Sequence, residues 1–218
     1  MNPIYKVANA VDWITVVLFF SMVVLALGKY LFQGRFLNFL ILPFNNRYVV
    51  LYNKKGQLLN WFHILLTIFQ LVNLSLFIFL IQKGLLASPA ESSITVFFTI
   101  MGVLILFQMV KLLLQYTKGF VFNTLDLVSE LMFNKISYLN YSSLIMFISN
   151  IILVYIFEDS KIVIYTALIL IVSINLIGVA KLLKNHQKAI ISYFLYFILY
   201  LCTLEIAPLV IVGSYLKD

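Results

Sequence analysis

Charged residues are scarce in this chain, and their scarcity excludes an ordinary soluble domain. Asp, Glu, Lys and Arg make up only 11% of the 218 residues, whereas a soluble globular domain needs roughly a quarter of its residues charged to cover its surface. Cysteine is nearly absent as well, because Cys202 is the single example. One cysteine can form neither an internal disulfide nor a thiolate metal cluster, so we interpret Cys202 as a small apolar packing residue.

Motifs that carry chemistry are also missing from the sequence. We find no glycine-rich phosphate loop, no nucleophile elbow and no paired carboxylates. His63 and His186 have neither a third ligand nor His-x-x-x-His spacing, so a metal or haem site is not expected. No block of Lys and Arg is interleaved with stacking aromatic residues, so the net charge of +7 does not indicate a nucleic-acid partner. We therefore expect a non-enzymatic protein without a cofactor.

Apolar residues, by contrast, are abundant and are gathered into long runs. They make up 63% of the chain. A helix that spans the bilayer core needs about 20 mostly apolar residues, and no run shows the alternating period that a membrane β-barrel requires. The runs of sufficient length are at about 11–32, 61–82, 94–116, 138–157, 162–183 and 189–213. We predict an all-α fold: a polytopic transmembrane helical bundle with six spans, forming one integral membrane domain over residues 1–218.

Cations are distributed unevenly between the two sides of this predicted bundle. Eleven of the 15 Lys and Arg residues fall on the side that holds the connections 33–60, 117–137 and 184–188. The opposite side holds only Lys6, Lys83, Lys161 and Lys217. Because the positive side of a membrane protein faces the cytoplasm, we predict that these three connections are cytoplasmic and that both termini are periplasmic.

Two of the basic connections are more than turns. In 33–60, the apolar cluster between residues 36 and 44 is too short to span, so we expect an interfacial or re-entrant segment, followed by an extended stretch at 48–52. In 117–137, Asn123 can cap a helix whose apolar residues recur at helical spacing. This amphipathic segment lies either on the membrane without a partner or against a partner helix. The candidate partner surface comprises Arg47, Lys54, Lys55, Asp126 and Glu130.

Amide side chains inside the predicted spans are costly in hydrocarbon, so each is a candidate site. With a rise of about 1.5 Å per residue, these amides form a loose belt near the middle of the membrane. The belt comprises Gln70, Asn73, Gln108, Asn150 and Asn175. Such amides often form hydrogen bonds between helices. We favour this structural interpretation over a solute site.

Glu205 is the only acid inside a predicted span, and Pro208 follows three residues later. The proline leaves the carbonyl of Leu204 free and is expected to bend the helix beside the carboxyl group. One hypothesis is a proton relay or cation site. The other, which we favour, is a protonated or hydrogen-bonded carboxyl group that locks the sixth helix to a neighbour, because proton relays normally contain chains of acids or histidines. Lys111 lies at a different predicted depth from Glu205, so the two are not expected to form an ion pair. The amine of Lys111 is instead expected to extend to the headgroups.

Three strings of this sequence resemble a known family. They are 42–48 (LPFNNRY), 138–141 (YLNY) and, most specifically, 199–209 (LYLCTLEIAPL). They resemble a family of small multi-pass inner-membrane proteins of Bacteroidota that is labelled only as a domain of unknown function. The resemblance runs nearly end to end and implies an inner-membrane location in a Gram-negative envelope, with no residue role to transfer. Neighbouring genes in that family include a polyprenol-phosphate mannosyltransferase, which implies a link to envelope assembly.

These observations leave competing functions. The first is a non-enzymatic inner-membrane subunit or scaffold in envelope assembly or secretion, which binds a membrane or cytoplasmic protein, or a second copy of itself, through segments 33–60 and 117–137. The alternative is a small transporter or lipid-handling protein that uses the mid-membrane Asn and Gln side chains and Glu205. A membrane enzyme acting on a lipid-linked sugar is the least favoured. It would need His63 together with Asp126 or Glu130.

Overall fold

The computed structural model describes residues 12–45, 47–52, 60–85, 94–121, 125–158 and 160–185. The chain divides into two compact units, Met1–Gly178 and Val179–Asp218. All packing reported below lies within the first unit, and the described part of the second is the last turns of one helix. Every element in the described part is helical, without a strand, which confirms the predicted all-α class for these residues. The single domain over 1–218 stays a prediction.

Long helices make up most of the described chain. They are α1 (Asp12–Leu31), α4 (Trp61–Leu85), α5 (Ile94–Val121), α6 (Leu125–Tyr155) and α7 (Lys161–Asn185). Each of these five contains a segment long and apolar enough to cross a membrane. They overlap the first five predicted spans, so the chain is a multi-pass membrane protein. The sixth predicted span, 189–213, lies outside the described residues, and the count of six stays a prediction.

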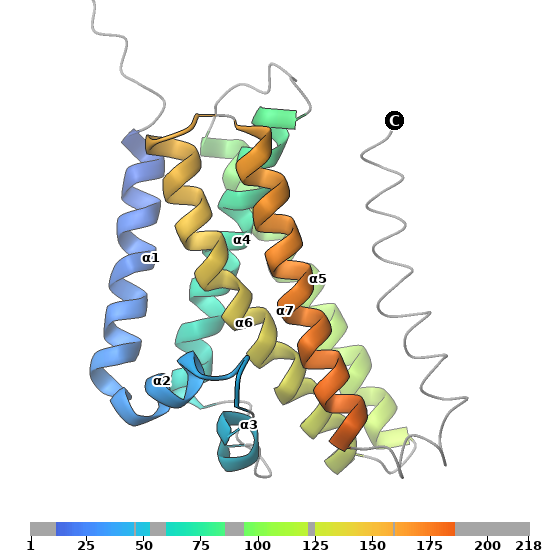
Figure 1. Cartoon of the computed structure of the whole chain (residues 1–218). Helices are drawn as coiled ribbons and strands as arrows, with labels where there is room; N and C mark the ends of the chain where they lie inside the picture. The colour runs from blue at the N-terminus through green and yellow to red at the C-terminus, as the bar shows by residue number, and fades with distance from the viewer. Residues whose placement is uncertain are drawn as a thin grey trace, which may run out of the picture. The chain divides into compact units, whose positions relative to one another are not determined.

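Helix α4 is the centre of the bundle. It packs against α1, α5 and α6, and α5 also packs against α6 (Figure 1). In the apolar segment of α4, 56% of the residues are buried, compared with 6% in that of α5. A central helix of this kind is apolar on most of its circumference. Helix α5 therefore presents most of its apolar surface outward, as a helix that contacts lipid does.

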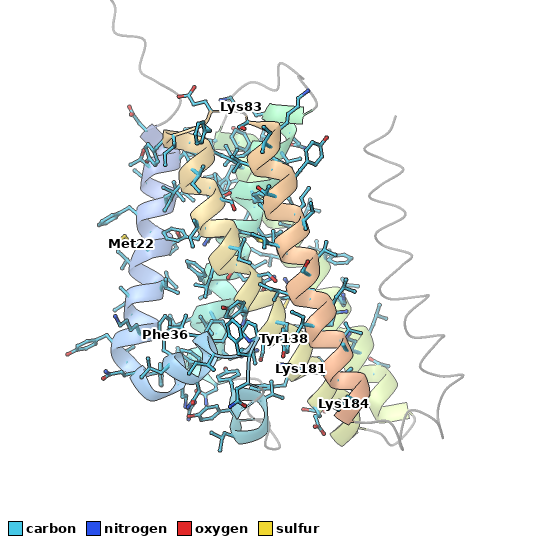
Figure 2. All side chains as sticks on the ribbon, viewed as in Figure 1. Met22, Phe36, Lys83, Tyr138, Lys181 and Lys184 are labelled. Carbon is cyan, nitrogen blue, oxygen red and sulfur yellow. The ribbon has the colours of Figure 1, made fainter. Side chains whose placement is uncertain are left out.

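Two short helices, α2 (Gln33–Leu40) and α3 (Arg47–Tyr52), lie at the end of the bundle where α1 ends and α4 begins (Figure 1). They pack on the bundle through a cluster of buried residues. The cluster comprises Phe36, Phe39, Leu42, Tyr48, Val49, Phe62, Leu66, Phe133 and Tyr138. Figure 2 labels two of its members, Phe36 and Tyr138, at this end, and Lys83 at the opposite end. The apolar cluster of the first connection is therefore partly core.

The stretch 48–52 forms helix α3, so the prediction that it is extended was wrong. Its Tyr and Val residues favour strands by propensity, but an isolated strand leaves its backbone groups without hydrogen-bond partners. Packing decides against it: Tyr48 stacks on Phe133 with ring centroids 5.8 Å apart, and Val49 is buried beside it. A helical turn places both side chains on the bundle while satisfying its own backbone.

The segment 117–137 is not a separate connection, which corrects the predicted boundary at residue 138. Helix α5 continues to Val121 and α6 begins at Leu125, so only 122–124, which include the predicted cap Asn123, lie outside the described residues here. No Gly or Pro interrupts residues 125–155, and Met132 and Phe133 are buried in the bundle. Part of the predicted amphipathic segment therefore packs inside this protein.

Candidate functional site

The mid-membrane amides of α4 and α6 meet in the bundle interior. Asn150 donates a hydrogen bond from Nδ2 to the backbone oxygen of Asn73, over 3.1 Å. Asn73 in turn donates to the backbone oxygen of Phe69, 2.8 Å away on its own helix. Both asparagines are fully buried, and Gln70 is nearly so. The side chain of Asn150 therefore links α6 to α4, whereas Asn73 contributes its backbone oxygen to this link.

The other two members of the predicted belt lie apart from this pair. Asn175 on α7 donates to Oγ of Ser142 on α6, over 2.9 Å, and to the backbone oxygen of Ile171. This is a second hydrogen bond between helices. Gln108 on α5 is half-buried and has no hydrogen bond to any described residue. The belt thus contains two separate interhelical links, and Gln70 and Gln108 take part in neither of them.

Several amide oxygens in the interior have spare accepting capacity. Gln70 Oε1, Asn73 Oδ1 and Asn150 Oδ1 are buried without a hydrogen-bond partner in the described part of the chain. Neither polar atom of the Asn140 amide has such a partner either. Buried polar groups of this kind normally bind protein or ordered water. These amide oxygens are therefore unsatisfied acceptors within the described part of the bundle interior.

The buried face of α6 is the polar feature that sequence reasoning missed. Its fully or nearly fully buried polar residues are Asn134, Ser137, Asn140, Ser142, Ser143, Ser149 and Asn150. Small polar residues at a helix interface allow close approach, and α7 approaches α6 so closely at Gly178 that a Cβ atom there would lie 2.6 Å from Cγ of Tyr138. The repeated Ser and Asn residues between 134 and 150 were the sequence feature from which this buried polar face could have been predicted.

A narrow pocket lies under α2 and α3, and we call it the end pocket. It is lined by Arg35, Tyr48, Tyr52, Asn60, Phe62, His63 and Phe133. Cζ of Arg35 lies 5.1 Å from the ring centroid of Tyr52 and 5.8 Å from that of Phe32, so the guanidinium is held by cation–π contacts. Burial raises the pKa of Tyr48, although the nearby charge of Arg35 acts in the opposite direction.

His63 is a deeply buried side chain of the end pocket, and its polar atoms have no partner in the described part of the chain. It is 4% exposed, its ring stacks on Phe133 with centroids 5.1 Å apart, and neither ring nitrogen has a hydrogen-bond partner among the described residues. Sequence reasoning had considered His63 only as a metal ligand or enzyme base. Within the described helices no three His, Cys, Asp or Glu side chains gather as a metal site would require.

The predicted partner surface is only partly within the described chain. Arg47 lies on α3 and Asp126 on α6, whereas Lys54, Lys55, Glu205 and Pro208 lie outside the described residues. Glu130 is half-buried on α6 and is engaged in an interaction, so it is not a free surface charge. Lys111 lies beside Lys135 of α6. The predictions for Glu205 and Pro208 stay untested.

The outer surface of α2, α3 and the turn between them is strongly apolar, and we call it the α2–α3 surface. Its exposed members are Leu37, Leu40, Ile41, Phe44 and Leu51. Phe44 is the extreme case, with 88% of its surface exposed. Large apolar side chains gathered at one end of a bundle are typical of a surface that binds a membrane or a protein.

Comparison with known proteins yields one match. A family model described as "Domain of unknown function (DUF4271)" matches residues 14–216. No curated protein and no solved structure matches the chain. Any function must therefore be argued from the residues of this chain.

Proposed function

We propose, for a chain that belongs to the DUF4271 family of unknown function, a role as a non-catalytic membrane subunit that holds a protein partner at the α2–α3 end of its bundle. The observation that carries this proposal is the α2–α3 surface. It presents exposed apolar side chains, Phe44 foremost, on a segment that is itself anchored to the bundle.

The anchoring supports binding because a preorganised surface loses little conformational entropy on association. Phe39 is fully buried directly beneath the surface. Its ring centroid lies 5.7 Å from that of Tyr48, 6.2 Å from that of Phe62 and 5.7 Å from that of Tyr141. These contacts connect α2 to α3, α4 and α6. A partner would thus meet a fixed surface.

Charge indicates the chemistry of the partner. The connection 33–60 contains Arg35, Arg47, Lys54 and Lys55 and no acid, so an apolar partner surface with an acidic rim fits best. The cation bias of the whole chain supports a cytoplasmic position for this end, in an inner membrane with both termini periplasmic. Together with the resemblance noted above, it supports a place in envelope assembly or secretion.

The proposal is tested by affinity capture from native membranes in mild detergent. We expect the wild-type chain to be recovered with a stoichiometric partner, and Phe44→Ala to lose that partner while keeping its fold. Phe157→Ala is the matched control, because Phe157 is also exposed but lies in the turn after α6. Recovery of the wild-type chain as a lone species under several detergents would contradict the proposal, and recovery as a homodimer would identify the partner as a second copy.

A second candidate is a small transporter or lipid-handling protein, and one observation favours it. Gln70 and Asn73 on α4 and Asn150 on α6 have buried amide oxygens without partners in the described chain. In this alternative, Glu205 adds a titratable group. Glu205→Gln would then abolish a pH-dependent uptake or lipid-flipping activity in liposomes. If the substitution only lowers the thermal midpoint, Glu205 has the structural role instead.

A further inference from the structure

The end pocket gathers hydrogen-bond donors from three helices that are distant in sequence. Arg35 comes from α2, Tyr48 and Tyr52 from α3, and Asn60 and His63 from the start of α4. No Asp or Glu is among the residues that line it. A pocket with an Arg, two phenols, an amide and an imidazole, and without a lining carboxylate, is suited to an anion.

His63 indicates that the pocket is incomplete without a ligand. A neutral imidazole carries one N–H donor and one acceptor nitrogen, and burying both without a partner costs free energy. His63 is 4% exposed, and both nitrogens lack a hydrogen-bond partner in the described chain. A phosphate oxygen in the pocket would accept the hydrogen bond that the N–H cannot donate elsewhere.

Arg35 supplies the charge that an anion requires. Its guanidinium is held over the ring of Tyr52 and has no ion pair with any described residue. Arginine presents parallel N–H groups that match two oxygens of a phosphate, and stacking on an aromatic ring orders this fork before binding. Arg35 is half-buried, so its charge is only partly screened by water.

Two further features favour an anion at this place. Helix α4 begins at Trp61, directly after Asn60, so the positive end of a 25-residue helix lies at the pocket. Burial raises the pKa of Tyr48, so its hydroxyl group keeps its proton and can donate. The apolar span of α1 ends at Leu31 and that of α4 begins at Trp61. The pocket therefore lies at the depth of the lipid headgroups.

We propose that the end pocket binds a phosphate group, held by Arg35 and His63 and reached from the headgroup layer. The cavity volume is about 10 Å³, which is room for about one water-sized group. One phosphate oxygen therefore enters the pocket, and the rest of the phosphate and of its ligand stay at the mouth. The source is either an anionic phospholipid or free phosphate, and the experiment below distinguishes the two. This inference does not depend on a protein partner.

The test is a binding titration of the detergent-solubilised full chain, followed by native mass spectrometry. The probes are dioctanoyl phosphatidylglycerol, dioctanoylglycerol (which lacks the phosphate) and inorganic phosphate. We expect phosphatidylglycerol to bind, dioctanoylglycerol not to bind, and Arg35→Gln to weaken phosphatidylglycerol binding at least about tenfold, as expected for loss of a charge-assisted hydrogen bond. Lys29→Gln is the matched control, because Lys29 is an exposed cation at the end of α1 outside the pocket.

The outcomes identify the source of the phosphate and test whether the end pocket is the binding site. Phosphatidylglycerol binding that persists in excess inorganic phosphate assigns the pocket to a lipid headgroup, whereas displacement by inorganic phosphate assigns it to the free ion. The proposal is overturned if dioctanoylglycerol binds as well as phosphatidylglycerol, or if Lys29→Gln weakens binding as much as Arg35→Gln. If Arg35→Gln does not fold, the binding of phosphatidylglycerol is measured with Arg35→Lys and Tyr52→Phe instead. Each is expected to weaken binding about threefold or more, and unchanged affinity in both overturns the proposal.

Discussion

Single residues determine how closely the helices of this bundle approach and which polar atoms join them. In the interior, Asn150 reaches the backbone of Asn73 across the α4–α6 interface. An interhelical hydrogen bond in a membrane bundle contributes about 0.6 kcal/mol on average and up to about 1.7 kcal/mol. The bond is therefore modest in free energy, but its position is specific.

We expect Asn150→Ala to lower the free energy of unfolding by about 1–2 kcal/mol, because the substitution removes this bond and leaves a small cavity. The measurement is an SDS titration from mild detergent micelles. Gln108→Ala is the control, since Gln108 has no hydrogen bond to a described residue, and it is expected to change stability by less than half as much. A stable Asn150→Ala variant that has lost uptake in liposomes would favour the solute-site hypothesis.

Gly178 is a second position where one residue controls packing. A Cβ atom added there would lie 2.6, 2.8 and 2.9 Å from Cγ, Cδ2 and Cδ1 of Tyr138. These atoms belong to the base of the ring, which cannot move away without displacing α6. We expect Gly178→Ala to destabilise the protein by about 1–3 kcal/mol, measured as a lower midpoint of thermal unfolding in detergent.

Gly102 provides the matched control for that substitution. It lies in α5, and a Cβ atom there would meet nothing within 4 Å. Because Ala is favoured over Gly in a helix by about 1 kcal/mol, Gly102→Ala is expected to be neutral or slightly stabilising. Equal losses for both variants would mean that the contact with Tyr138 does not limit the approach of the helices.

At the scale of whole elements, the short helix α2 depends on its packing against the bundle for its order. This short helix is fixed from below by Phe39, which is fully buried, while Phe44 in the following turn is 88% exposed. A helix of eight residues has little stability alone. Its order must therefore come from the aromatic contacts beneath it.

We expect Phe39→Ala to destabilise the protein by about 3–5 kcal/mol, because it leaves a cavity among the rings of Tyr48, Phe62 and Tyr141. Phe44→Ala is expected to change stability by less than about 0.5 kcal/mol. Thermal unfolding followed by far-ultraviolet circular dichroism measures both. If the two variants unfold at the same temperature, α2 is not anchored through Phe39.

Across the whole molecule, orientation in the membrane is the property that decides where partners and lipids can bind. Arg35 lies on α2 at the end of the bundle that carries α3, whereas Lys83 lies at the other end (Figure 2). The cation count predicts that the α2–α3 end is cytoplasmic. The end pocket and the α2–α3 surface would then face the same compartment.

Cysteine labelling tests this orientation. In a Cys202→Ser background, we expect Glu158→Cys to react with a membrane-impermeant maleimide in cells whose outer membrane is permeabilised. Phe44→Cys should react only after lysis. Glu158 is exposed in the turn after α6, and Phe44 is exposed at the opposite end. The reverse labelling pattern would place both termini in the cytoplasm and contradict the predicted orientation.

Hydropathy by itself determined the class of this protein and the course of its first five spans. This is possible because the bilayer imposes a fixed length on any helix that crosses it and requires its backbone to be satisfied internally. The same reasoning applies to the amides: the side chains of Asn150 and Asn175 form hydrogen bonds to neighbouring helices. Polar groups at membrane depth need hydrogen-bond partners, so a polar residue within an apolar run predicts a hydrogen bond to another helix.

Only the tertiary structure determined which residues of the helices contact one another. Hydropathy cannot tell a helix surface that faces lipid from one that faces another helix, because both are apolar. For this reason the boundary of α6, the helical form of α3 and the approach of Gly178 to Tyr138 escaped prediction. The end pocket escaped for a related reason. Arg35, Tyr48 and His63 lie on three elements, and only packing of those elements brings their side chains together.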